Sequence, residues 1–183
     1  LRVSNIDDGV FLSVNGLPRK RYRYNDPEQG VRLDVSSWFS DGNNTLRIQN
    51  VNGGGPGNFH VELWFDQKLI VDASCPAEIC ASSSLYEGLV YDKTFTFSTP
   101  GLPPAQKVEI TSPRSGKLYF NDAFTGLSTP VTLSLPVGDS TLALGLSTDD
   151  LTTPVASYHE RKVTVGRCPQ RVDLSTAPAP APA

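Results

Sequence analysis

Residues 30–52, GVRLDVSSWFSDGNNTLRIQNVN, carry the pattern that decides the fold class of this 183-residue chain. Apolar and polar residues alternate over 31–35, a polar turn follows at 41–44, and the alternation resumes over 45–50. Alternation with a period of two is typical of strands with one buried face, and Asp-Gly-Asn-Asn is typical of a turn. The stretch therefore predicts two half-buried strands joined at a polar turn, in an all-β protein.

The same alternation recurs along the chain between segments rich in Gly and Pro, and no segment keeps a helical period for three turns. The predicted strands cover 10–14, 21–24, 31–35, 45–50, 59–65, 68–72, 90–97, 107–111, 117–120, 131–135, 141–147 and 161–165. The breaker-rich segment 98–105 predicts a linker between two domains. The predicted division is a first domain at 1–100, a second at 106–168 and a Pro/Ala-rich tail at 169–183.

The charge and composition argue against nucleic acid as a partner and against a membrane span, and they do not identify a compartment. A net charge of −3 gives no long-range attraction to nucleic acid. No apolar run approaches the roughly 20 residues of a membrane span. The chain begins at Leu1 and contains no Met, which favours a processed or truncated chain, so secretion cannot be read from a leader.

Three cysteines bear on the compartment. Cys75 and Cys80 enclose a short loop that a disulfide would stabilise by roughly 2 kcal/mol on loop-entropy grounds. Two reduced thiols are the alternative, and zinc would need more cysteines or nearby histidines. Cys168 is either free or paired outside this sequence. Because a disulfide between Cys75 and Cys80 is the favoured alternative, we expect an oxidising compartment and hence a secreted or cell-surface location.

The first half resembles the galactose-binding-like jelly rolls that occur as non-catalytic modules beside glycoside hydrolases. The matching pieces are 8–16, DGVFLSVNG; 33–39, LDVSSWF; and 42–46, GNNTL. Asn15-Gly16 suits the positive φ angles of a tight turn. The resemblance implies a jelly-roll β-sandwich in which at least one of Trp38 and Phe39 belongs to the core.

The second half resembles the PEGA domain, a small surface β-sandwich without a catalytic site. The matching pieces are 112–113, SP; 116–122, GKLYFND; 126–130, GLSTP; and 133–138, LSLPVG. The departure is Asn121-Asp122-Ala123, where that family usually has Asp-Gly. The resemblance implies an adhesion or envelope module.

The segment 59–65, FHVELWF, holds the leading candidates for ligand binding. If the residues at 61, 63 and 65 face the core, then His60, Glu62 and Trp64 share the opposite face. An aromatic ring beside a carboxylate suits sugar recognition, because the ring stacks on a pyranose and the carboxylate accepts from hydroxyls. Structural packing of Trp64 against a covering loop or the second domain is the alternative.

Tyr22 and Tyr24 lie on one face of the basic segment 19–24 and are further candidates for carbohydrate contact. Arg21 and Arg23, on the opposite face, suit an acidic glycan or phosphate. Two tyrosines at the edge of the core, with solvated arginines, are the alternative.

A glycine-rich segment and a set of carboxylates are further candidates for ligand contact. The glycine-rich segment 52–57 lacks the Lys-Ser/Thr of a phosphate-binding loop and predicts a hairpin loop that could help shape the Trp64 site. The carboxylates of Asp7, Asp8, Asp26 and Glu28 offer hard oxygen ligands for a structural Ca²⁺, with solvated turns as the alternative. No other cofactor is expected.

No catalytic signature is present, since the two histidines fall in different domains and no nucleophile elbow or zinc-protease motif occurs. We therefore expect a non-catalytic, extracytoplasmic pair of modules that binds carbohydrate or a cell-surface polymer within a larger protein. The alternative is a stalk or assembly scaffold that contacts other protein domains and binds no small ligand.

Overall fold

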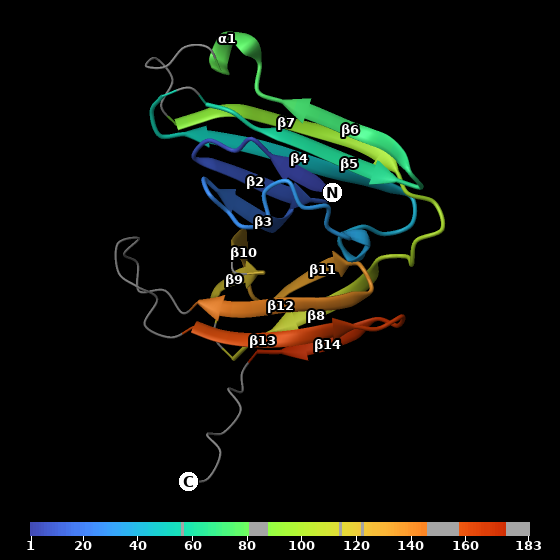
Figure 1. Ribbon diagram of the computed structural model, residues 1–183. Helices are drawn as coiled ribbons and strands as arrows, with labels where there is room; N and C mark the ends of the chain where they lie inside the picture. Colours follow the sequence, from blue (N-terminus) through green and yellow to red (C-terminus); the bar gives the residue numbers. More distant parts are fainter. Residues whose placement is uncertain (56, 81–87, 114, 122, 146–157, 175–183) are drawn as a thin grey trace. The chain divides into compact units, whose positions relative to one another are not determined.

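The regular structure of the chain is built from β-strands in two separate units. The computed structural model describes residues 1–55, 57–80, 88–113, 115–121, 123–145 and 158–174. Within these ranges the helical parts are a 3₁₀ turn, η1 (Ser36–Trp38), and a four-residue helix, α1 (Ala77–Cys80). The chain divides into Leu1–Pro100 and Gly101–Ala183, inside the predicted linker (Figure 1). The predicted all-β class is confirmed.

The first unit contains one sheet of three strands and one of four. The larger sheet has the order β3-β2-β4-β7, whose strands are labelled in Figure 1, and the smaller sheet has the order β1-β5-β6. Their bounds are β1 (Arg2–Ser4), β2 (Gly9–Val14), β3 (Leu17–Arg23), β4 (Asn43–Asn52), β5 (His60–Phe65), β6 (Lys68–Ser74) and β7 (Gly88–Ser98).

Three segments of the chain each contribute one strand to both sheets: β1 with β2, β4 with β5, and β6 with β7. In the smaller sheet β5 pairs with β1 on one edge and β6 on the other, and in the larger sheet β4 pairs with β2 and β7 in the same way, all antiparallel. Each neighbouring pair of segments therefore contributes a strand pair to both sheets, and β3 adds the outermost strand beside β2. This arrangement leaves the two faces of each sheet chemically different, with one face toward the core.

Apolar side chains from both sheets fill the core of the first unit. Val10 and Ile48 of the larger sheet and Val61 of the smaller sheet have no exposed surface. The ring of Phe59, just before β5, contacts that of Tyr91 on β7, with centroids 4.8 Å apart, so this contact links the two sheets. Burial of each such side chain contributes roughly 1.5–3 kcal/mol.

The predicted strand at 31–35 is wrong. The segment makes one isolated bridge, between Arg32 and Arg2, and Val31 is 46% exposed. Gly30 N–H donates to the carbonyl of Val3 at 2.7 Å, so the segment runs along the free edge of β1 without becoming a strand. The Asp34 carboxylate then accepts from the backbone N–H of Ser36 at 2.9 Å, a local turn that ends the extended conformation just before η1.

Other features of the predicted jelly-roll pieces have clear structural roles. Asn15 and Gly16 both have positive φ, 52° and 79°, and form the two-residue turn between β2 and β3. Phe39 lies in the core, with 5% exposure. Asn44 is buried, and its amide donates to the hydroxyl of Thr99 at 2.8 Å and accepts from the amide of Asn15 at 2.8 Å.

The second unit is also built from a four-stranded and a three-stranded sheet, with the orders β10-β9-β12-β13 and β11-β8-β14. Leu118, Leu142 and Ile110 are fully buried and represent both sheets. The strands are β8 (Gln106–Thr111), β9 (Lys117–Phe120), β10 (Ala123–Ser128), β11 (Val131–Leu135), β12 (Gly138–Gly145), β13 (Tyr158–Val165) and β14 (Gln170–Asp173).

The predicted boundary at residue 168 is wrong, because the chain continues in the second unit as β14. This strand pairs in parallel with β8, and Val172 and Leu174 are 5% and 3% exposed. The Pro/Ala segment 177–183 lies outside the described residues, as does the end of the strand predicted at 141–147.

Candidate functional site

The outer face of the β1-β5-β6 sheet brings together three of the five predicted binding residues. Val61 and Leu63 of β5 are buried, whereas His60, Glu62 and Trp64 are half-buried and point away from the core. This matches the alternation expected from the sequence, although a bulge after Leu63 shifts the register. We call this surface, with its neighbours Arg2, Arg32 and Asp72, the Trp64 face.

Charged partners from the neighbouring strands fix the polar residues of this face. Nη1 of Arg2 lies 3.7 Å from a carboxylate oxygen of Glu62, directly across the β1–β5 pairing. Nε2 of His60 lies 2.8 Å from Oδ1 of Asp72 on β6. Glu62 and Asp72 also oppose each other in register, so two carboxylates lie between an arginine and a histidine.

Arg32 covers the indole ring of Trp64. The guanidinium carbon lies 4.2 Å from the ring centroid, within the range of a cation–π contact. Arg32 reaches this position because its segment is hydrogen-bonded to β1. No pattern in the sequence marks Arg32 as a site residue, because alternation predicts neither β1 nor the path of residues 30–33 along its edge.

Tyr22 lies on the other sheet, in β3, and Tyr24 follows the end of that strand, so neither joins the Trp64 face. Tyr22 is 1% exposed, and burial raises the pKa of its hydroxyl above the ordinary value. Tyr24 follows the end of β3 and is 65% exposed. The structure thus separates the two tyrosines that the alternation placed together, and only Tyr24 is accessible to a surface ligand.

Three of the four predicted calcium ligands have partners within the protein. Asp8 accepts from the backbone of Gly53 at 2.6 Å, and Asp26 accepts from the backbone of Glu28 at 3.0 Å. Glu28 also forms an ion pair with Lys20. Across the ranges that the structure describes, no group of three or more His, Cys, Asp or Glu side chains is placed to hold a metal ion.

The glycine-rich loop at 52–57 is not a hairpin loop, because β4 and β5 belong to different sheets. Gly54 and Gly55 have φ of 123° and 93°, values that favour glycine, and the Asn52 amide donates to the carbonyl of Gly55 at 2.9 Å. The loop therefore carries the chain from one sheet to the other, and Asp8 secures it.

Cys168 is a free, exposed thiol. The side chain of Cys80 lies outside the described residues, so the disulfide between Cys75 and Cys80 stays a prediction.

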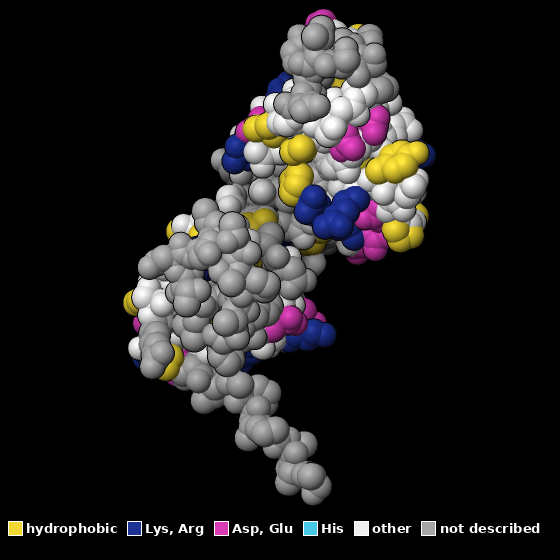
Figure 2. Space-filling model, turned by 90° about the vertical axis from the view of Figure 1, so that its left-hand side faces the viewer, with side chains coloured by type: hydrophobic (Ala, Val, Ile, Leu, Met, Phe, Trp, Pro, Cys, Tyr) yellow, Lys and Arg dark blue, Asp and Glu magenta, His cyan; other side chains and the backbone are white. Residues whose placement is uncertain are grey.

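The larger sheet carries a separate ion pair on its outer face. Arg47 donates to both carboxylate oxygens of Asp92, at 2.7 and 2.5 Å, and Gln49 donates to Asp92 at 3.2 Å. These hydrogen bonds and the Arg47 charge lower the pKa of the Asp92 carboxyl below its ordinary value. In Figure 2 a group of basic side chains lies beside acidic and apolar side chains on the first unit.

Comparisons with protein-family models, curated proteins and solved structures return no match. The jelly-roll and PEGA resemblances therefore stay predictions, while the structure defines the chain as a two-unit β-sandwich protein. Within the described part of the chain, no helix has the length and apolar character needed to span a membrane.

Proposed function

We propose that this chain is a non-catalytic, extracytoplasmic pair of β modules that binds carbohydrate through the Trp64 face of the first unit, as part of a larger protein. The observation that carries the proposal is the placement of Trp64, Glu62 and His60 on one outer face, each held by a partner side chain. A binding surface held in this way loses little conformational freedom when a ligand arrives.

The chemistry of the face suits sugar hydroxyls, which both donate and accept hydrogen bonds. Glu62 and Asp72 supply acceptors, and the guanidinium groups of Arg2 and Arg32 supply donors. Arg32 lies over the indole of Trp64. A pyranose therefore stacks its carbon face on the indole in place of the guanidinium, whose planar N–H groups then donate to sugar hydroxyls beside the ring.

The same Arg32 contact also favours a second candidate, a stalk or protein-interaction segment without a small ligand. In that case the guanidinium simply closes the indole surface, and the Trp64 face is structural. The two candidates differ in what happens when Trp64 is removed.

A glycan array and a pull-down on insoluble polysaccharides test the proposal with the full chain. We expect binding to at least one glycan, and Trp64→Ala to weaken it by about tenfold or more, because an aromatic ring at the centre of a contact contributes much of its binding energy. Leu89→Ala is the matched control, since Leu89 is 55% exposed on the larger sheet and its loss leaves the Trp64 face intact. A wild-type chain that binds no glycan, or equal binding by Trp64→Ala, supports the structural candidate instead.

A further inference from the structure

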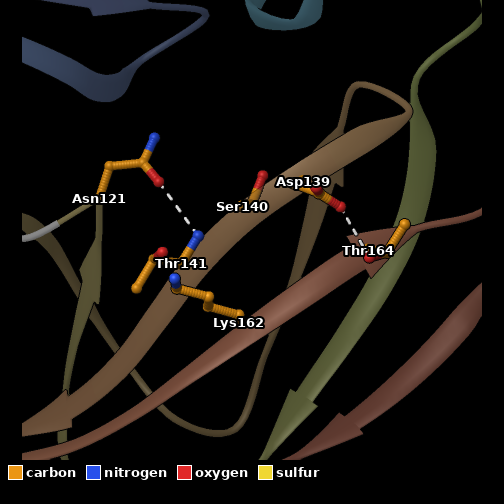
Figure 3. Close-up of a pocket in the computed structure, with 6 residues that line it drawn as sticks. All are labelled: Asn121, Asp139, Ser140, Thr141, Lys162 and Thr164. Atoms are coloured by element: carbon orange, nitrogen blue, oxygen red, sulfur yellow. Dashed lines mark hydrogen bonds between the residues drawn. The ribbon is translucent and has the colours of Figure 1, made fainter.

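The second unit contains a polar hollow that no sequence motif indicated. Its volume is about 430 Å³, within the range of small-ligand sites. The last residue pair between β12 and β9 is Leu142 with Phe120, and the hollow lies beside residues 138–141 of β12, which extend past the end of β9. Six residues line it (Figure 3): Asn121, Asp139, Ser140, Thr141, Lys162 and Thr164.

Side chains of the hollow are held in place by hydrogen bonds. Asn121, which follows β9, accepts from the backbone N–H of Thr141 at 3.1 Å, and its own N–H donates to the carbonyl of Thr141 at 2.9 Å. The hydroxyl of Thr164 donates to Asp139 at 2.7 Å. Figure 3 shows these two contacts on opposite sides of Ser140.

The backbone of β12 adds hydrogen-bonding groups at the same place. Residues two apart in an antiparallel strand direct their N–H and C=O groups to the same edge. The N–H and C=O of Thr141 face Asn121, on the β9 side of β12. The N–H and C=O of Asp139 therefore face the same side, at a level that β9 does not reach.

The lining has no net charge, which decides the class of ligand. Asp139 and Lys162 contribute opposite formal charges, and the other lining groups are an amide and three hydroxyls. A charged ligand would meet a like charge as well as an opposite one. A ligand rich in hydroxyls can use the donors and the acceptors together.

An aromatic pair lies next to the hollow on the same sheet. Tyr119 of β9 and Phe124 of β10 are cross-strand partners with ring centroids 5.6 Å apart, and Phe124 is 48% exposed. Tyr119 also pairs with Ala143, which lies two residues after Thr141 and so on the same face of β12. Tyr119 is therefore about 7 Å along the strand from the polar lining, and Phe124 lies one strand further from β12, on β10.

We infer that this face of the second unit is a separate binding site for a neutral saccharide. One sugar residue hydrogen-bonds in the hollow, to Asp139, Asn121 and Lys162, and the adjoining residue stacks on Phe124. The inference uses no residue of the Trp64 face, so either site can bind without the other.

The test is a titration of the full ¹⁵N-labelled chain with four neutral oligosaccharides, maltotriose, cellotriose, mannotriose and xylotriose, followed by NMR. We expect at least one of them to shift the backbone amides of Tyr119, Asn121 and residues 139–141. Phe124→Ala and Asp139→Asn should each weaken this binding by about tenfold, as expected for loss of a stacking or charge-assisted contact.

Glu109→Gln is the control for Asp139→Asn, because Glu109 is an exposed carboxylate on the other sheet of the same unit. The shifts should persist in Trp64→Ala, which separates this site from the one proposed in the first unit. Absence of these shifts with all four saccharides overturns the inference, as does wild-type affinity in both Phe124→Ala and Asp139→Asn.

Discussion

The guanidinium of Arg32 lies over the indole of Trp64, 4.2 Å from the ring centroid. This contact joins an irregular segment at the edge of β1 to the outer surface of β5. It places a cation and an aromatic ring, far apart in the sequence, on one surface. The predicted properties of the Trp64 face depend on this pair.

Removing Arg32 should expose the indole of Trp64 to water. In a Trp38→Phe background, where Trp64 is the remaining tryptophan, we expect Arg32→Ala to shift the fluorescence emission to longer wavelength. The loss of stability should be about 0.5–1 kcal/mol, the usual range for an accessible cation–π pair. An unchanged emission maximum would show that Arg32 does not cover the ring in solution.

Asn44 should matter for stability far more than its neighbour Asn43. Asn44 is 1% exposed, and its amide bonds to Asn15, Ser40 and Thr99. Asn44→Ala removes the acceptor of the buried Ser40 N–H and the amide that donates to Ser40 and Thr99, at a cost of about 1–3 kcal/mol. Denaturant unfolding measures the difference, and Asn43→Ala, at an exposed position, is the control. Equal effects of the two substitutions would contradict this account.

The ion pair of Asp92 with Arg47 should make the stability of the first unit depend weakly on pH in the acidic range. Because hydrogen bonds from Arg47 lower the pKa of the Asp92 carboxyl in the folded state, the ionised form stabilises the fold above about pH 4. That contribution is lost as the pH falls through the folded pKa. Asp92→Asn should therefore lower the melting temperature near neutral pH, by a few degrees at most because the pair is exposed. The difference should vanish well below pH 4. A constant difference down to pH 2 would show that the carboxylate charge is not its cause.

The three cysteines should differ in reactivity if the predicted disulfide forms. Alkylation of the unfolded, unreduced protein should modify Cys168 alone, because Cys75 and Cys80 are then joined. After reduction all three should react, which intact-mass spectrometry distinguishes. Three modified thiols before reduction would contradict the disulfide and weaken the argument for an oxidising compartment.

Much of the fold could be predicted from the alternation of apolar and polar residues, because a strand with one buried face has an apolar residue at every second position. The patterns at 45–50 and 59–65 agree with β4 and β5, and Asn15-Gly16 forms the expected turn. Alternation fails at 31–35 because the segment has one neighbouring strand, β1, and makes a single bridge to it. The three-residue β1 is too short to carry a periodic pattern, and so its partner could not be identified.

The candidate site was predictable only in part, because a sequence pattern shows which residues share a face of one strand but not which distant segments lie beside it. Trp64, Glu62 and His60 share a face because they alternate along one strand, which is local information. Arg32 reaches that face through pairings between distant segments, which one sequence does not reveal. Tyr22 and Tyr24 also alternate, but β3 ends at Arg23, so Tyr24 leaves the sheet while Tyr22 stays in the core.

The most direct test of the central proposal is the affinity of the full chain for the glycan that it binds best on the array, measured by calorimetry for the wild type and for Trp64→Ala. We predict that the substitution raises the dissociation constant by about tenfold or more, while Leu89→Ala leaves it unchanged. A dissociation constant that is the same for Trp64→Ala and the wild type, or no glycan binding at all, would contradict carbohydrate recognition by the Trp64 face.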